Sequence, residues 1–327
     1  MTGPALAMTD LRVGFTVPSG TVSAVDGVSL TVQPGQIVGL VGESGCGKST
    51  LANAVMGLLP AQAQATGSVL LDGEQILAAD PDRLRELRGD QIAMIFQDPS
   101  TSLDPTFSIG DQVAETIRAH RPVSRSQARE RAVQLLGQVG IPDAAARYAD
   151  PPHRFSGGMR QRVVIAAALA NDPTVLIADE PTTALDVTIQ AQILRLIAAL
   201  CREQGTAVLL ITHDLGVVAQ VCDRVGVMYA GQLVEEAPVA DLFATPQHPY
   251  TRALLAALPS AEAEPGRLAV IPGQVPDLSG ALPGCRFLDR CDRARAECVE
   301  RPQPVAVGAT TVACWDVTAR AAGEVTP

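Results

Sequence analysis

The sequence Gly42-Glu43-Ser44-Gly45-Cys46-Gly47-Lys48-Ser49-Thr50 decides the fold of this chain of 327 residues. It follows an apolar run, residues 37–41, and precedes a stretch that favours a helix, residues 51–58. This spacing of Gly42 and Gly47-Lys48-Ser49 is that of a phosphate-binding loop. Its glycines let successive N–H groups surround a phosphate, and the positive end of the next helix faces the anion. We expect Lys48 to reach the β- and γ-phosphates of a nucleotide and Ser49 to bind Mg²⁺.

Lys48 is the only lysine in the sequence, because the other 24 of the 25 Lys and Arg residues are arginines. The planar arginine fork does not reproduce the compact, flexible ammonium group of lysine. A glycine-rich turn that merely resembles the motif is the alternative interpretation. The retained lysine favours a nucleotide site.

The composition is that of an ordinary globular chain long enough for two domains, with 47% hydrophobic and 18% charged residues. A net charge of −10 argues against general nucleic-acid binding, which needs a basic surface. No apolar run approaches the roughly 18–20 residues of a membrane span, and residues 1–10 lack the features of a signal peptide. We therefore expect a soluble, cytoplasmic protein that meets a membrane, if at all, through a partner.

Strand and helix patterns alternate along the first 240 residues. Residues 67–77 read as a hairpin that turns at Asp72-Gly73, and the strands indicated later in the chain are separated by helical patterns. This alternation predicts an α/β fold with a mostly parallel sheet and sites at the carboxyl ends of its strands. After about Asp241 the chain is proline-rich and loses this rhythm. We predict a nucleotide-binding domain over residues 1–240 and a separate C-terminal extension over residues 241–327.

Polar residues follow three of the predicted strands. The run at residues 175–180, Val-Leu-Ile-Ala-Asp-Glu, delivers Asp179 as a second anchor for Mg²⁺ and Glu180 as the general base that polarises a water molecule. Gln97 and His213 each follow another strand, where they suit contacts with a γ-phosphate. The alternative for the two carboxylates is that they cap the following turn. Taken singly, Gln97 and His213 also read as incidental loop residues.

A second helix start rich in glycine occurs at residues 155–162, Phe-Ser-Gly-Gly-Met-Arg-Gln-Arg. It lacks the Gly-Lys-Ser end of a phosphate loop, yet its N–H groups and helix dipole also suit an anion. With this motif the chain resembles the ATP-binding cassette (ABC) ATPases over about residues 9–240. The motifs of that family occur in order: the phosphate loop, the Gln97 loop, the Ser-Gly-Gly signature, Asp179-Glu180, the Ala184-Leu185-Asp186 loop and His213.

The resemblance implies that two cassettes pair head-to-tail, so that the signature of one contacts the ATP bound by the other. Ser156, Gly157 and Gly158 then serve the ATP of the partner cassette. His213 contacts the γ-phosphate within its own chain, and Asp186 crosses the interface. The partner is a second ATPase subunit, identical to this chain or different from it.

The resemblance also implies a parallel core sheet, an antiparallel β subdomain and a helical subdomain at about residues 98–155. In the family this subdomain, with the Gln97 loop, grips a membrane subunit, and Gln97 joins Ser49 and Asp179 around Mg²⁺. Phe15 occupies the place of an adenine-stacking residue, although a buried strand phenylalanine fits the pattern equally well. The implied partners are two transmembrane permease subunits and, indirectly, a substrate-binding protein, with this chain at the cytoplasmic face of the membrane.

Two segments point to a subfamily. The signature begins with Phe155 and carries Met159, a variant that resembles the oligopeptide/dipeptide importer ATPases. Residues 247–255, Gln-His-Pro-Tyr-Thr-Arg-Ala-Leu-Leu, are similar to the start of the C-terminal region of that subfamily. We therefore expect peptide import. Nickel or another small solute, an exporter and a soluble ABC ATPase outside transport are the alternatives.

Four of the seven cysteines, Cys285, Cys291, Cys298 and Cys314, lie close together in the sequence. Four thiolates suit tetrahedral zinc or a [4Fe–4S] cluster, and the spacing alone does not decide between them. The peptide-importer ATPases have similar cysteines that are associated with an iron–sulfur cluster, so the resemblance favours a cluster. Unmetallated or disulfide-prone thiols stay open as well. Asp292 departs from the proline that is common in relatives.

Cys46 lies inside the phosphate loop at a helix N-terminus, an environment that lowers the pKa of a thiol. We expect alkylation of this thiol to inhibit ATP hydrolysis and bound nucleotide to protect against it.

Overall fold

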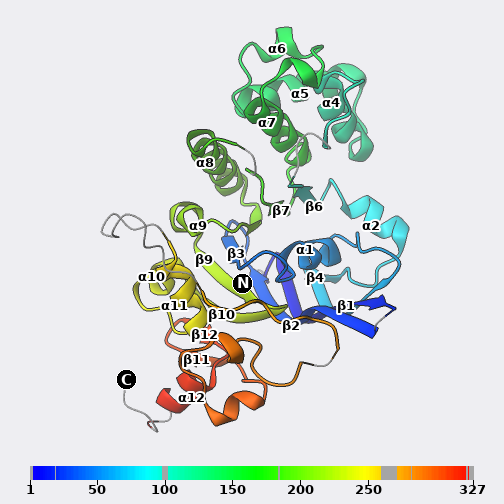
Figure 1. The fold of residues 1–327 in the computed structure, drawn as a ribbon. Coiled ribbons are helices and arrows are strands. Elements are labelled where there is room, and N and C mark those ends of the chain that lie inside the picture. Colours follow the sequence, from blue (N-terminus) through cyan, green and yellow to red (C-terminus); the bar gives the residue numbers. More distant parts are fainter. Residues whose placement is uncertain are drawn as a thin grey trace.

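The computed structural model describes residues 3–18, 20–97, 102–182, 185–258, 271–280, 282–321 and 323. Within these residues the chain forms two sheets, a group of helices at one end and the C-terminal extension at the other (Figure 1). No helix in the described ranges is both long and apolar enough to cross a membrane.

Strands and helices alternate along the chain, as the sequence predicts. The strands are β1 Leu6–Val17, β2 Gly20–Val32, β3 Ile37–Val41, β4 Ala63–Leu71, β5 Glu74–Gln75, β6 Ile92–Ile95, β7 Val175–Asp179, β8 Ala207–Ile211, β9 Arg224–Tyr229, β10 Gln232–Pro238, β11 Val305–Val307 and β12 Thr310–Val312. The helices are α1 Lys48–Val55, α2 Pro81–Leu87, α4 Ile109–His120, α5 Arg125–Gln138, α6 Ala144–Arg147, α7 Gly157–Ala168, α8 Val187–Gln204, α9 Leu215–Val221, α10 Val239–Ala244, α11 Pro249–Ala256 and α12 Trp315–Ala321, with short 3-10 turns η1 Pro152–Arg154, η2 Leu288–Arg290 and η3 Ala296–Val299.

The larger sheet carries the parallel core. Its order over the described residues is β11-β12-β10-β9-β3-β8-β7-β6, in which β3 runs parallel to β8 and β9, and β7 runs parallel to β8 and β6. Every residue of β3, β7 and β8 is buried, because the core strands of such a sheet are covered on both faces. The carboxyl ends of β3, β8, β7 and β6 therefore meet at one edge, which confirms the predicted parallel core.

The smaller sheet is antiparallel, with the order β2-β1-β4-β5 among the described residues. β4 and β5 form the predicted hairpin, and its turn residues Asp72 and Gly73 both have positive φ angles, 47° and 85°. This left-handed backbone suits Asp and Gly, the residue pair that the sequence offers. An apolar cluster that includes Leu11 and Leu40, both fully buried, joins the two sheets.

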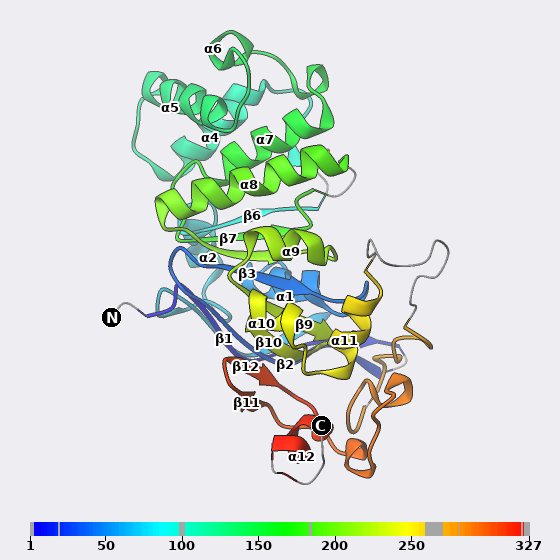
Figure 2. The ribbon, with the colours of Figure 1, turned by 90° about the vertical axis from the view of Figure 1, so that its left-hand side faces the viewer.

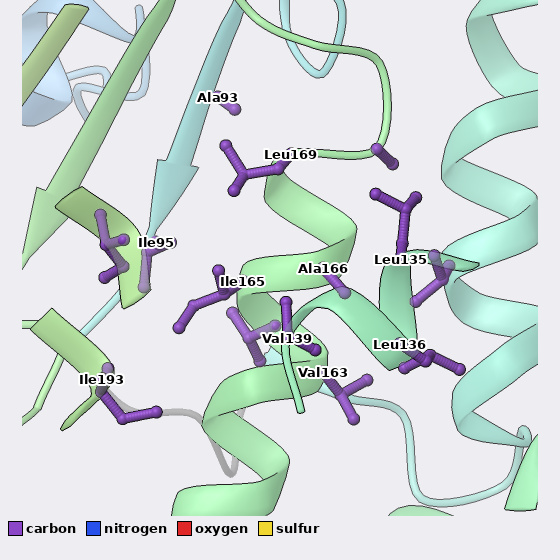
Figure 3. Packing of buried hydrophobic residues seen from close by; sticks show 14 of the residues in the cluster. Ala93, Ile95, Leu135, Leu136, Val139, Val163, Ile165, Ala166, Leu169 and Ile193 are labelled. Atoms are coloured by element: carbon purple, nitrogen blue, oxygen red, sulfur yellow. The ribbon is translucent and has the colours of Figure 1, made fainter. Parts of the chain in front are cut away.

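Helices α4, α5 and α6 lie within the residues predicted as a helical subdomain, about 98–155, and α7 packs with them outside that range. Helix α8 separates this group of helices from the lower part of the molecule (Figures 1 and 2). Figure 3 shows how α7 connects these helices to the sheet: Ile165 of α7 and Leu169, directly after its end, lie close to Ile95 of β6, and Leu135 of α5 lies on the other side of the same helix. Residues 98–101, at the start of the predicted subdomain, lie outside the described residues.

The C-terminal extension continues the larger sheet. β12 pairs with β10, with Val312 opposite Glu235 and Thr311 opposite Glu236, so the end of the chain packs onto the nucleotide-binding domain (Figure 2). The expected appendage thus shares a sheet with the first 240 residues. The domain boundary near residue 241 stays a prediction.

Asp26 of β2 forms ion pairs with two arginines of the extension. Its carboxylate pairs with Arg286, at 2.7 Å, with Arg301, at 3.2 Å, and with Arg12. Burial raises the pKa of this carboxyl, but a hydrogen bond from Gln232 and the three guanidinium charges outweigh burial and leave the pKa below its ordinary value.

Candidate nucleotide-binding site

The phosphate loop connects β3 to α1, as the sequence predicts. The Lys48 Nζ atom is buried under the loop and donates to the carbonyl oxygens of Gly42, at 2.7 Å, and Glu43, at 3.1 Å. Ser49 Oγ donates to Asp179 Oδ1, at 3.2 Å, so the two predicted Mg²⁺ ligands lie side by side. Ser44, Gly45 and Ser49 are exposed, and Thr50 is half-buried.

Two loop glycines are required by close backbone contacts. A Cβ atom at Gly47, whose φ is 98°, would lie 2.2 Å from the carbonyl oxygen of Ala24. A Cβ atom at Gly42 would lie 2.1 Å from the carbonyl oxygen of Met228. Any side chain at either position would push the loop away from the strands that support it, so the sequence keeps glycine there.

Three predicted residues from three neighbouring strands meet beside the loop. Gln97, after β6, donates from Nε2 to Glu180 Oε2 at 3.0 Å, and His213, after β8, places Nδ1 3.2 Å from Glu180 Oε1. Glu180 itself follows β7, which lies between β6 and β8 in the sheet. Its φ of 45° is unusual for a non-glycine residue, and its N–H group is held by the carbonyl oxygen of Ile211 at 2.9 Å.

Asp179 is 5% exposed at the end of β7. Burial raises the pKa of its carboxyl, the hydrogen bond from Ser49 lowers it, the adjacent Glu180 carboxylate raises it and Lys48 lowers it, with a net pKa above the ordinary value. A cation near these oxygens would reverse this balance, because it favours the ionised carboxylate. The donor set of one hydroxyl and one carboxylate fits a hard cation such as Mg²⁺.

The lowered pKa expected for the Cys46 thiol is wrong. Its side chain is 1% exposed, and burial raises the pKa of the thiol above its ordinary value even though Lys48 Nζ lies 3.6 Å from Sγ. Desolvation of the thiolate therefore outweighs both the lysine charge and the helix N-terminus.

The Ser-Gly-Gly signature lies apart from the phosphate loop. Ser156 caps α7 and accepts a hydrogen bond from the N–H group of Met159 at 3.4 Å. Gly157 and Gly158 face a hollow of about 410 Å³ that Leu185, Asp186 and Ile189 also line, while no described residue of the phosphate loop does. Ala184 of the predicted interface loop lies outside the described residues. The structure thus brings the signature and Asp186 together, apart from the described residues of the phosphate loop.

Phe15 lies on β1, half-buried and packed against the apolar cluster between the two sheets. Its neighbours across the strands are Val22 and Ala63. Adenine stacking by Phe15 stays a prediction.

All four cysteines of the extension are free thiols. Backbone N–H groups point at two of them, with Arg293 donating to Cys291 Sγ at 3.4 Å and Arg295 to Cys298 Sγ at 3.5 Å. Burial raises the pKa of Cys285, to about 12, and that of Cys314. Within the described residues, no three His, Cys, Asp or Glu side chains are arranged to hold a single metal ion.

The extension also contacts the phosphate loop, which the sequence did not predict. Tyr250 Oη accepts a hydrogen bond from the N–H group of Glu43, at 3.0 Å, and Arg290 pairs with the Glu43 carboxylate. These partners are separated by 207 and 247 positions, and no motif in the sequence signals either contact.

Comparison with known proteins agrees with this geometry. Residues 25–183 match the ABC transporter family, and residues 234–298 match the C-terminal region of oligopeptide/dipeptide transporters. A putative peptide import ATP-binding protein of Brucella abortus (strain 2308) is 49% identical over 93% of this chain and 92% of its own length. The dipeptide transport ATP-binding protein DppD of Bacillus subtilis (strain 168) is 48% identical over 95% and 94%.

A solved dimeric ATP-binding cassette in a post-hydrolysis state, bound to ADP and phosphate, has a TM-score of 0.64 and 29% identity to this chain. The match covers 72% of this chain and 98% of that one. The predicted resemblance and fold class are thereby confirmed. With near-half identity across more than nine tenths of its length to named relatives, a phosphate loop in place and a matching cassette fold, the chain belongs to the ABC transporter family as an ATP-binding cassette ATPase.

Proposed function

We propose that this chain hydrolyses ATP to drive the uptake of oligopeptides or dipeptides through partner membrane subunits. The observation that carries the proposal is the meeting of Gln97, Glu180 and His213 beside the phosphate loop. It occurs in a chain whose C-terminal region matches that of oligopeptide/dipeptide transporters. The relatives named above are peptide and dipeptide transport proteins, which favours peptides over nickel.

ATP binding would use the loop as it stands. Lys48 would exchange the loop carbonyls for the β- and γ-phosphates, and the glycines would leave the loop N–H groups free to face them. Ser49 and Asp179, with Gln97 nearby, would hold Mg²⁺, which when bound neutralises charge on the phosphates. Glu180 would accept a proton from the attacking water while Gln97 and His213 fix its two oxygens.

A second cassette would complete the site. The signature hollow holds Ser156, Gly157, Gly158 and Asp186 but none of the described phosphate-loop residues, so it has anion-binding groups and no nucleotide of its own. Head-to-tail pairing would place the signature of each chain over the ATP of the other. The dimeric form of the solved cassette supports this pairing. Val187, 82% exposed beside Asp186, is an apolar residue that such an interface would cover.

Membrane subunits have a suitable surface in a hollow of about 940 Å³ between the sheet and the helical subdomain. Phe96, Phe107 and Leu58, which are 44%, 55% and 40% exposed, line it. Large exposed apolar side chains gathered in one hollow indicate a protein partner. We place the chain at the cytoplasmic face of the membrane, bound to two permease subunits, with a substrate-binding protein acting through them.

The proposal includes an iron–sulfur cluster bound by the four cysteines of the extension. It is supported by four free thiols in one short segment and by backbone N–H groups directed at the sulfurs of Cys291 and Cys298, which would stabilise thiolates. The four sulfurs of a cluster lie farther apart than the ligands of one ion, so the missing single-ion geometry does not conflict with it. Equal amounts of iron and acid-labile sulfide in protein purified without oxygen, lost in Cys298→Ser, would support the cluster. Zinc or no metal would refute it.

Uptake by cells tests the function. In cells that lack this chain, uptake of a labelled dipeptide should fall and should return with the wild-type chain but not with Lys48→Ala, which removes the phosphate-binding ammonium. Nickel uptake serves as the matched control and should not change. Loss of nickel uptake with normal dipeptide uptake would replace peptides by nickel as the cargo.

A further inference from the structure

Arg290 of the extension lies against the phosphate loop. Its guanidinium group forms a two-pronged pair with the Glu43 carboxylate, with Nη1–Oε2 at 2.7 Å and Nη2–Oε1 at 3.1 Å. The same group donates to Tyr229 Oη at 3.2 Å and to the carbonyl oxygens of Pro272, at 2.8 Å, and Ile271, at 3.3 Å. Each of its five N–H groups thus has an acceptor, and the side chain is 5% exposed.

Glu43 is held from two directions and touches the lysine site. Its N–H group donates to Tyr250 Oη, and its carboxylate binds Arg290. Its carbonyl oxygen accepts from Lys48 Nζ, at 3.1 Å, and from the N–H group of Cys46, at 3.3 Å. A shift of Glu43 would therefore move a direct partner of the lysine that we expect to bind the phosphates.

A buried aromatic cluster of Tyr229, Tyr250 and Phe287 supports the contacts with Glu43. The rings of Tyr229 and Tyr250 have centroids 4.6 Å apart, and Phe287 lies 5.2 Å from Tyr229 and 5.4 Å from Tyr250. Tyr229 and Tyr250 are fully buried, and Phe287 is 2% exposed. Arg290 is the last residue of the short turn η2, which begins directly after Phe287, so the packing of Phe287 places this turn against the cluster.

From these contacts we infer that Arg290 is a positioning residue for the phosphate loop. Through Glu43 it keeps the first turn of the loop in the shape that binds ATP, and the C-terminal extension thereby sets the ATP affinity of the cassette. The inference rests on ATP binding at this loop and does not depend on which solute is transported. Without Arg290, about one loop residue would have to be ordered on binding, which corresponds to about tenfold in the Kd for ATP.

A merely structural role for the extension is the competing explanation, and the chain offers a matched control. Arg301 is also an extension arginine paired with a core carboxylate. Its Nη1 lies 3.2 Å from Asp26 Oδ2, and its Nη2 donates to the backbone carbonyl oxygen of Asp26 at 2.8 Å. Asp26 belongs to β2 and not to the phosphate loop. Arg301→Gln therefore loosens the extension without releasing Glu43.

The experiment measures the Kd for MgATP, by titration with a fluorescent ATP analogue and competition with ATP, and the kcat of the assembled complex. Arg290→Gln should raise Kd and KM about tenfold and leave kcat within about twofold. Glu43→Gln should have the same effect on Kd. The double variant should be no worse than either single variant, because both substitutions remove the same Arg290–Glu43 pair. The Kd of Arg290→Lys should lie between those of the wild type and Arg290→Gln, since an ammonium group keeps the charge but cannot donate to five acceptors. Arg301→Gln should bind ATP as the wild type does.

Three results would overturn the inference. The first is an unchanged Kd in a folded Arg290→Gln protein, with the melting temperature and circular dichroism as the check on folding. The second is an equal loss of ATP affinity in Arg301→Gln, and the third is additive losses in the double variant; either would make the effect one of general stability. Failure of the wild-type chain to bind ATP would instead count against the proposed function, so the two failures are distinguishable.

Discussion

Replacing Glu180 with Gln tests the assignment of the general base. The substitution keeps the length and shape of the side chain, so the 3.0 Å contact from Gln97 can survive. The contact with His213 is 3.2 Å long and involves an imidazole that is 69% exposed, so its loss costs little because solvent screens it. What disappears is the basicity of the carboxylate. General-base catalysis contributes about 10²–10⁴-fold, which equals roughly 2.7–5.5 kcal/mol of transition-state stabilisation.

The assay is steady-state release of phosphate by the purified complex, together with the Kd for MgATP. We expect kcat of Glu180→Gln to fall at least about 100-fold, while the Kd for MgATP changes by less than about threefold. ATP should then accumulate between paired cassettes, and size-exclusion chromatography should detect the pair. Gln190→Ala serves as a control, because Gln190 donates its side-chain hydrogen bond to Asp214, at 3.1 Å. Steady-state hydrolysis by Glu180→Gln near the wild-type rate would refute the assignment.

Three further outcomes follow from burial and charge. Iodoacetamide should leave Cys46 unmodified in the native protein, because its thiol is 1% exposed and its pKa is raised, and rapid labelling seen by mass spectrometry would contradict this. Asp26 has a lowered pKa in the folded protein, so the stability it contributes is present above the unfolded pKa of about 3.9 and is lost as the pH falls through the folded pKa. Below about pH 4 the melting temperature should therefore drop more steeply in the wild type than in Asp26→Asn. Asp82→Asn, at an exposed site, should follow the wild type. Ile165→Ala should lower stability by about 2–5 kcal/mol, and Val187→Ala by less than about 0.5 kcal/mol in the unpaired chain, with equal thermal shifts counting against the packing in Figure 3.

Local chemistry made much of the fold and site predictable. The phosphate loop needs glycine where the backbone approaches other strands, and a buried strand that ends in carboxylates has few other uses, so Lys48 and Asp179 could be placed in a common site. The order of strands in the sheet then brought Gln97 and His213 to either side of Glu180. These inferences worked because each depends on residues that are close in sequence or on the general rule that sites lie at the carboxyl ends of parallel strands.

The remaining features depend on packing between distant segments. The lowered pKa expected for Cys46 was wrong because the sequence shows a helix start and a lysine, while the burial that dominates the pKa is supplied by the fold. The extension was expected to stand apart, yet β12 pairs with β10 and Arg290 reaches Glu43. Neither the pairing of the three-residue strand β12 with β10 nor a single arginine contact has a sequence signal of its own.

The most direct test of the central claim is peptide uptake by vesicles that contain this chain with its partner ATPase and permease subunits and the substrate-binding protein. With ATP on the side of this chain, a labelled dipeptide should accumulate in the direction of import, and hydrolysis should rise with the peptide. Both should fall to background with Glu180→Gln, while ATP binding remains. Vesicles that hydrolyse ATP through Glu180 but accumulate no peptide would contradict the claim that this cassette powers peptide import.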